Sequence, residues 1–138
     1  MNTPTEYELQ LKARLVTSPV VASFTFVEEK VWLDRGYIRI RMALSNGDFL
    51  EAAEYFVLED DECVTHRYRY QWMDRERREL RKRWDNVEHY PGLPNFPHHV
   101  HVGKEENVEP GERLSTIELL DVLASEIPNR QTHRKVEA

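Results

Sequence analysis

The segment YIRIRMALSNGDFLEAAEYF, residues 37–56, constrains the fold of this chain more than any other stretch. Asn46 and Gly47 tolerate the left-handed backbone of a tight turn, and apolar residues recur at every second position on both sides of them. Two strands joined by such a turn form a β-hairpin, so the segment predicts an antiparallel sheet.

The length of this turn decides which side chains share a face of the sheet. A turn of two residues pairs Ser45 with Asp48, which sets Ile40 opposite Ala53 and Arg39 opposite Glu54. One face of the hairpin is then apolar. The other face carries three charged residues: Arg39, Arg41 and Glu54.

Further strands are predicted on both sides of the hairpin. Residues 20–33 and 63–73 are rich in β-branched and aromatic residues. The connection MDRERRELRK, residues 73–82, suits either an exposed helix or a turn that leads into a returning strand, and the turn is the preferred interpretation. These segments together predict a meander of about five antiparallel strands.

A helix is predicted at each end of the sheet. Thr3 and Glu6 form a capping box with Pro4 at the first helical position, which predicts a helix from Pro4 to Thr17. Ser115 and Glu118 form a second capping box for a helix that Pro128 ends. The expected fold is α+β, with residues 1–128 as one domain, both helices packed on one face, and a disordered tail over 129–138.

Composition bounds the class of protein. The 138 residues are 40% hydrophobic and 32% charged, as expected for a soluble globular domain. No apolar run reaches the roughly 20 residues that span a bilayer, and the acidic N-terminus is unlike a secretory signal. We therefore expect a cytoplasmic protein without a membrane partner.

Charge is segregated along the chain. The net charge is −6, but residues 66–84 hold eight Lys or Arg against three acids, a local charge of +5. This distribution allows a local anion-binding face on a protein that would otherwise repel nucleic acid. A solvated charged hairpin explains the same pattern equally well.

The segment RWDNVEHYPGLPNFPHHVHVG, residues 83–103, holds four of the six histidines and three of the seven prolines. The prolines favour an extended backbone, and an extended backbone points His99 and His101 to one face and His98 to the other. Two imidazoles at this spacing can bind a phosphate or a metal ion. A plain surface loop remains a third interpretation.

Both chemical interpretations have the residues they need. Hydrolysis of a phosphoester without a metal uses imidazoles for proton transfer and Arg83 to stabilise charge, while Tyr68 and Tyr70 can stack on RNA bases. A divalent metal would bind His99 and His101 with either His89 or Asp85, a ligand set that suits zinc, nickel or iron. Alternating aromatic residues such as Tyr68 and Tyr70 are also typical of half of a core.

The order of several motifs resembles the TumE family of small bacterial and archaeal proteins, the toxin component of a toxin and antitoxin gene pair. The motifs are YRYQW at 68–72, RWDN at 83–86, His89, and FPHHVH at 96–101. The resemblance covers residues 36–101 well and extends more loosely to the final helix. The connection at residues 73–82 departs from it, being longer and more basic than the family's compact turn.

The resemblance implies a toxin-like role and a cognate antitoxin, which would cover residues 67–83 or the histidine segment by charge complementarity. It carries over six positions: Glu54, Arg83, Asp85, His89, His99 and His101. Ribonuclease activity is common among small toxins, so the leading hypothesis is RNA cleavage without a metal cofactor.

In this hypothesis His99 and His101 transfer protons, Arg83 stabilises charge and Asp85 orients a histidine. Glu54 holds Arg39 or acts as a base. The expected substrate contacts come from four residues: Tyr68, Tyr70, Arg39 and Arg41. The alternatives are a metal-dependent phosphoesterase with a divalent ion at His99 and His101, and a non-enzymatic protein-interaction module. Tyr55, Phe56 and the edge strands could also support a homodimer.

Overall fold

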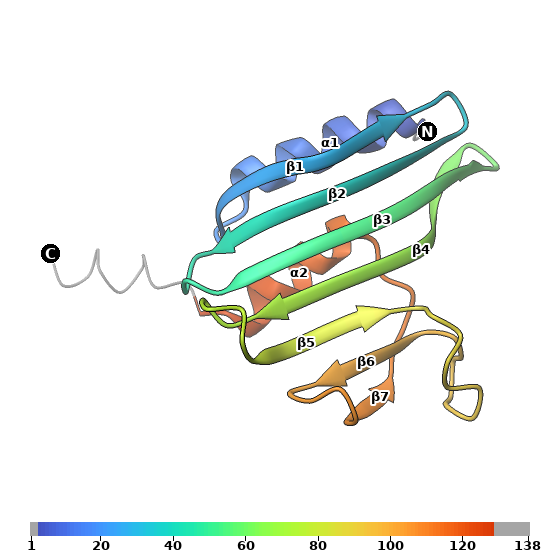
Figure 1. Cartoon of the computed structure of the whole chain (residues 1–138). Coiled ribbons are helices and arrows are strands. Elements are labelled where there is room, and N and C mark those ends of the chain that lie inside the picture. The colour runs from blue at the N-terminus through green and yellow to red at the C-terminus, as the bar shows by residue number, and fades with distance from the viewer. Residues whose placement is uncertain (1–2, 129–138) are drawn as a thin grey trace, which may run out of the picture.

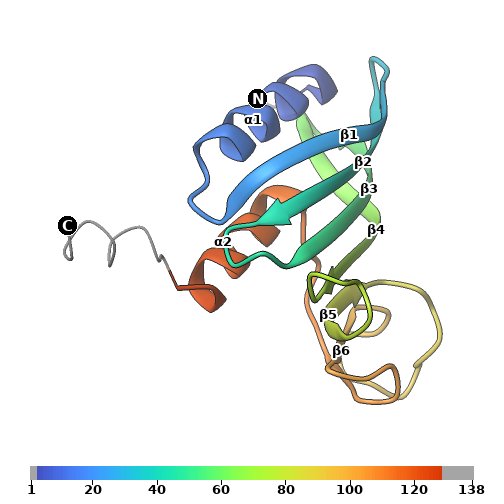
Figure 2. The same cartoon turned by 60° about the vertical axis from the view of Figure 1, so that its left-hand side comes forward.

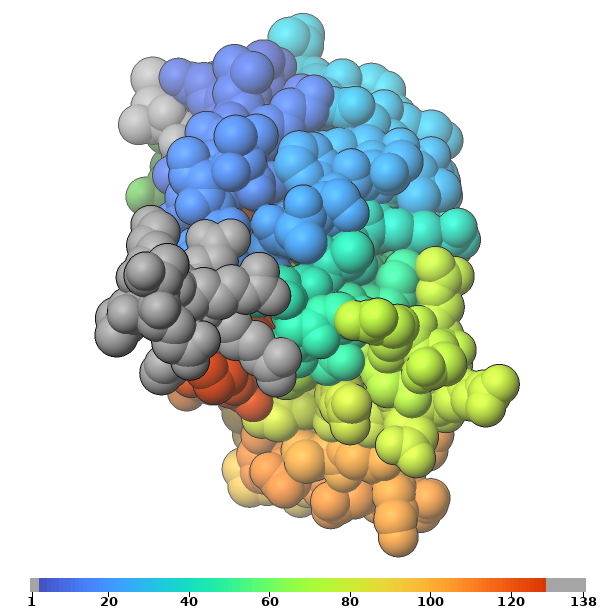
Figure 3. Space-filling view, turned by 90° about the vertical axis from the view of Figure 1, so that its left-hand side faces the viewer, coloured from blue at the N-terminus to red at the C-terminus, as the bar shows by residue number. Residues whose placement is uncertain are grey.

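Seven antiparallel strands form one sheet in the order of the chain, and two helices lie on one of its faces (Figures 1 and 2). The computed structural model describes residues 3–128. The elements are α1 (Pro4–Thr17), β1 (Val21–Val31), β2 (Arg35–Leu44), β3 (Phe49–Glu59), β4 (Glu62–Met73), β5 (Leu80–Asp85), β6 (His99–Val102), β7 (Val108–Pro110) and α2 (Thr116–Glu126). Figure 3 shows the blue N-terminal part of the chain at one end of the molecule and the orange segment at the other.

The predicted α+β meander is confirmed, but the prediction of about five strands is wrong. The two additional strands are β6 and β7, of four and three residues. Strands this short leave almost no alternating pattern in the sequence, and β6 lies in the segment rich in histidine and proline. The preferred turn and strand at residues 73–85 are confirmed by the pairing of β4 with β5. The expected tail at 129–138 lies outside the described residues.

Both helices begin where the capping boxes predicted. The Thr3 hydroxyl accepts a hydrogen bond from the Glu6 backbone N–H at 3.2 Å, and the Ser115 hydroxyl accepts one from the Glu118 N–H at 3.1 Å. The core lies between these helices and the sheet, where Leu11 of α1 and Leu119 of α2 are fully buried. Within residues 3–128 neither helix is long and apolar enough to cross a membrane.

The predicted register of the hairpin between β2 and β3 is wrong by one residue. The loop has three residues instead of two, because Leu44 N–H donates to the Asp48 carbonyl at 2.8 Å and Gly47 takes a left-handed φ of 93°. The shift sets Ile38 opposite Glu54 and Arg39 opposite Ala53. A shift of one residue turns every side chain of a strand to the other face, so Glu54 lies on the helix-covered face of the sheet.

Tyr55 and Phe56, which the sequence offered as support for a homodimer, lie on opposite faces of the sheet. Phe56 is fully buried in the core, with its ring against the backbone of Gly36. Tyr55 lies on the sheet face away from the helices and lines a cavity there.

Gly36 is expected to tolerate no side chain. A Cβ atom at this position would lie 2.6 Å from Cε2 of Phe56, which has no room to move in the core. We expect Gly36→Ala to lower the free energy of unfolding by about 1–3 kcal/mol, measured by urea denaturation. Gly92→Ala is the matched control, since a Cβ there meets no atom within 4 Å. Equal stability of the two variants would contradict this packing.

Candidate active site on the helix-free face

The sheet face away from the helices, called the helix-free face below, carries polar side chains in aligned rows. Strand pairing sets the members of each row directly opposite one another across β2 to β6. One row is Arg39, Ala53, Arg69, Asp85 and His99; the next is Arg41, Glu51, Gln71, Arg83 and His101. The β5 and β6 ends of both rows therefore bring together four of the residues that the sequence predicted: Arg83, Asp85, His99 and His101.

Asp85, His99 and His101, called the His–Asp cluster below, are each only 2% exposed. His99 Nε2 lies 2.9 Å from Asp85 Oδ1, and His101 Nε2 lies 3.8 Å from Asp85 Oδ2. The two imidazole centroids are 5.0 Å apart. Burial excludes the surface-loop interpretation for His99 and His101. His98 points to the other face, as predicted, and its Nδ1 lies 2.9 Å from the Tyr68 hydroxyl.

The ring nitrogens of the two histidines face different hydrogen-bond partners. His99 Nδ1 lies 2.9 Å from the Pro97 carbonyl and His101 Nδ1 lies 2.7 Å from the Glu105 carbonyl, so both Nδ1 atoms carry a proton. His99 Nε2 also faces an acceptor, the Asp85 carboxyl group, and a second proton fits there. His101 Nε2 instead faces a donor, Arg83 Nη2 at 3.2 Å, so it keeps a lone pair.

Arg83 joins the cluster to Glu105. Its Nε lies 3.2 Å from Asp85 Oδ2, its Nη2 donates to Glu105 Oε2 at 2.6 Å, and its Nη1 donates to Glu105 Oε1. These hydrogen bonds from Arg83 to Glu105 raise the pKa of Arg83 and lower the pKa of Glu105. The guanidinium is thus a positive charge next to the His101 imidazole, held by a carboxylate that is itself exposed.

A loop closes over the cluster and leaves a cavity of about 320 Å³. The Tyr90 ring lies with its centroid 5.0 Å from that of His99 and 6.0 Å from that of His101. His89 lines the same cavity and is itself exposed. A small anionic group that enters this cavity would lie beside both imidazoles.

The cluster also meets the requirements of a metal site. Its three residues each offer one ligand atom, and these atoms lie within 4.8 Å of one another. Each histidine donates its Nδ1–H to a backbone carbonyl, which is how histidines that bind metals through Nε2 are commonly oriented. Two nitrogens and one oxygen suit zinc, nickel or iron.

Glu54 lies apart from this site. It is fully buried on the helix-covered face, and the predicted pairing with Arg39 is wrong. Arg39 and Arg41 do lie on the helix-free face, where Glu51 pairs with both, at 3.4 and 2.9 Å. Glu51 takes the place predicted for Glu54 because the register shift turns Glu51, and not Glu54, toward the arginines.

Tyr68 and Tyr70 lie in the core, which was the sequence-based alternative to stacking on RNA bases. Tyr70 is fully buried and its hydroxyl donates to the Leu114 carbonyl at 2.8 Å; Tyr68 is 4% exposed. Neither ring offers a free face on which an RNA base could stack, so the expected stacking on these two rings is not available in this structure.

Sequence reasoning missed Glu105, Tyr90 and Arg69. Tyr90 follows His89 directly, which is a usable indication of its place near the site. Glu105 lies four residues after His101 in a turn between β6 and β7, two strands that the sequence did not predict. Arg69 joins the site only through its pairing with Asp85.

A comparison with protein families matches residues 11–131 to the family model described as Toxin TumE. No match was found among the curated proteins or among the solved structures. The matched range includes every residue of the His–Asp cluster, together with Arg83 and Glu105.

Proposed function

This chain belongs to the TumE toxin family, and on that premise we propose that it is a toxin that cleaves RNA at the His–Asp cluster. The family supports a toxin-like role and an antitoxin partner. The observation that carries the proposal of RNA cleavage is the pair of buried imidazoles 5.0 Å apart, one with a lone pair at Nε2 and the other with room for a proton there.

The proposed reaction uses the 2′-hydroxyl of the RNA as nucleophile. His101 Nε2 accepts the proton of that hydroxyl while its oxygen forms a bond to phosphorus. His99 Nε2–H gives a proton to the 5′-oxygen as the bond between that oxygen and phosphorus breaks. The products are a 2′,3′-cyclic phosphate and a 5′-hydroxyl, and a second proton transfer restores both imidazoles.

Asp85 and Arg83 support these proton transfers. Asp85 lies 2.9 Å from His99 Nε2 and orients that ring toward the cavity. Arg83 faces the cavity from β5 and stabilises the negative charge that develops on the phosphorane. Glu105 is exposed, and the scissile phosphate takes its place as the partner of Arg83.

The direct test is incubation of the purified chain with labelled total RNA, with and without a chelator. We expect fragments with 2′,3′-cyclic phosphate ends in both conditions, because no step of the proposed reaction uses a metal. Expression is expected to arrest growth, and the product of the adjacent gene to relieve the arrest. Intact RNA in both conditions, in the presence of growth arrest, would leave the toxin role and remove the ribonuclease activity.

The orientation of both Nδ1–H groups toward backbone carbonyls favours a second candidate, a metal-dependent phosphoesterase with the same three residues as ligands. Elemental analysis of the purified protein separates the two. The second candidate expects about one equivalent of a transition metal, lost in His99→Ala, and cleavage that stops when a chelator is added. The leading proposal expects no dependence of cleavage on bound metal.

A further inference from the structure

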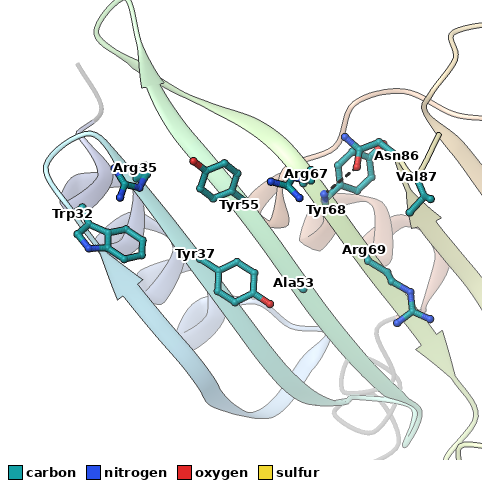
Figure 4. Close-up of a pocket in the computed structure, with 10 residues that line it drawn as sticks. All are labelled: Trp32, Arg35, Tyr37, Ala53, Tyr55, Arg67, Tyr68, Arg69, Asn86 and Val87. Carbon is teal, nitrogen blue, oxygen red and sulfur yellow. Dashed lines mark hydrogen bonds between the residues drawn. The ribbon is translucent and has the colours of Figure 1, made fainter.

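A second cavity, of about 430 Å³, lies on the helix-free face beside the site, over β2, β3 and β4 (Figure 4). We call it the aromatic groove and define it by six of the residues that line it: Trp32, Arg35, Tyr37, Tyr55, Arg67 and Arg69. None of its lining residues among the described part of the chain is acidic. On a protein with a net charge of −6, this is a local surface of opposite character.

The strand register builds the groove. Tyr37 lies opposite Tyr55, and Tyr55 lies opposite Arg67, so two rings and a guanidinium follow one another across three strands. In the neighbouring row Ala53 lies between Arg39 and Arg69. Its small side chain leaves space on the floor of the groove. Figure 4 shows both tyrosine rings on the face away from the helices.

Arg35 of the groove pairs with Asp34 at 3.2 Å, whereas the other two arginines of the groove are paired with no carboxylate of the described residues. Among residues 3–128, Arg67 and Arg69 form no salt bridge within 4 Å. Arg67 instead lies 5.7 Å from the centroid of the Tyr55 ring, and Arg69 donates to Gln71 Oε1 at 2.8 Å. Their charge is available to a ligand.

The groove is continuous with the cavity of the His–Asp cluster. Arg69 and Val87 line both cavities, and Arg69 lies directly opposite Asp85 in the sheet. Neighbouring strands are about 4.8 Å apart, and Tyr55 lies two residues along β3 from Ala53, which is in the row of Asp85, so Tyr55 on β3 is about 12 Å from Asp85 on β5. A ligand that fills the groove therefore extends toward the imidazoles.

We propose that the aromatic groove binds a single-stranded segment of the RNA substrate, with bases stacked on Tyr37 and Tyr55 and phosphates on Arg67 and Arg69. Rings and guanidinium groups in alternation are the surface that proteins present to unpaired bases and their backbone. Bases in a duplex are stacked on each other and leave no face for these rings. The choice of RNA as ligand rests on the proposed function.

Binding is tested apart from cleavage with a fluorescent single-stranded oligodeoxynucleotide, which lacks the attacking 2′-hydroxyl. Fluorescence anisotropy is expected to show binding by the wild-type chain that Tyr55→Ala weakens by roughly 5- to 150-fold, while Tyr55→Phe keeps it. Arg67→Ala is expected to reduce the slope of log K against log salt by about 0.7. Arg14→Ala is the control, because Arg14 lies on α1, on the other side of the sheet.

The outcomes separate this inference from the proposed function. No binding by the wild type, or equal binding by Tyr55→Ala and Arg67→Ala, overturns the groove as a nucleic-acid site even if RNA is cleaved. Binding as expected with RNA left intact supports the groove and removes the ribonuclease activity. If Tyr55→Ala loses the antitoxin but keeps the oligonucleotide, the occupant is a protein and the inference is wrong.

Discussion

Substitution of His101 by alanine is expected to lower the rate of RNA cleavage by about 10²- to 10⁴-fold. The loss follows from the removal of Nε2, the one imidazole nitrogen of the His–Asp cluster that faces a donor and keeps a lone pair. The rate is measured on labelled RNA with purified protein. Growth arrest on expression should weaken in parallel, since both depend on the same proton transfer.

His101 is 2% exposed, so alanine also leaves a cavity and an unpaired Glu105 carbonyl. His101→Asn separates the loss of the base from the loss of packing. The asparagine amide can still donate to that carbonyl, but it has no group at the position of Nε2. Both variants are expected to lose cleavage, and the asparagine variant to lose less stability. His98→Ala is the matched control and should cleave at the wild-type rate, since His98 lies on the other face. An asparagine variant as active as the wild type would exclude His101 as the base.

Glu54 is the residue whose loss is expected to destabilise the fold most. Its carboxyl group lies fully buried and accepts hydrogen bonds from side chains of α1, β4 and α2. The donors are the Tyr7 hydroxyl at 2.7 Å, the Thr65 hydroxyl at 2.7 Å, and the Thr116 hydroxyl and backbone N–H at 2.6 and 3.1 Å. One side chain thus joins both helices to the sheet.

Glu54→Ala is expected to lower the free energy of unfolding by about 3–5 kcal/mol, because it leaves several buried donors without an acceptor and creates a cavity. The measurement is urea denaturation followed by circular dichroism. Glu51→Ala is the control on the same strand, since Glu51 faces the helix-free side in partly exposed ion pairs worth about 1 kcal/mol or less. A loss for Glu54→Ala no greater than that control would show that the network contributes little.

The pH dependence of stability gives the same residue a second readout. Burial raises the pKa of Glu54, against the opposing hydrogen bonds from Thr116, Thr65 and Tyr7. A raised pKa in the folded state means that stability is fully present below the unfolded-state pKa and declines as the pH rises through the folded-state value. The wild type should therefore lose more stability than Glu54→Gln between acidic and neutral pH.

Local patterns predicted the helices and the pairing of histidines. The capping boxes at Thr3 and Ser115 act within four residues, so the sequence alone identifies them. Alternation in an extended strand placed His99 and His101 together without knowledge of the rest of the fold. Their burial was not predictable, because it depends on a covering loop and on Asp85 of a neighbouring strand.

The register of the hairpin between β2 and β3 was not predictable from local sequence. An Asn-Gly sequence permits loops of two or three residues, and the choice here is accompanied by contacts of Asp48 with distant side chains. Asp48 Oδ2 accepts from Trp72 Nε1 at 2.9 Å and from Arg81 Nε at 3.3 Å. These partners lie 24 and 33 residues away, so no local pattern identifies them. The prediction placed Glu54 on the wrong face of the sheet because it assumed a loop that is one residue too short.

The order of the strands has a consequence for the synthesis of the protein. Each strand pairs only with its neighbours in the chain, so the sheet can form progressively while the ribosome is still adding residues. β1 to β5 are complete before either histidine of the His–Asp cluster has been made. A chain whose translation stops before His99 is thus a partial sheet that lacks both imidazoles of the His–Asp cluster, and the cluster can assemble only after β6 has been made.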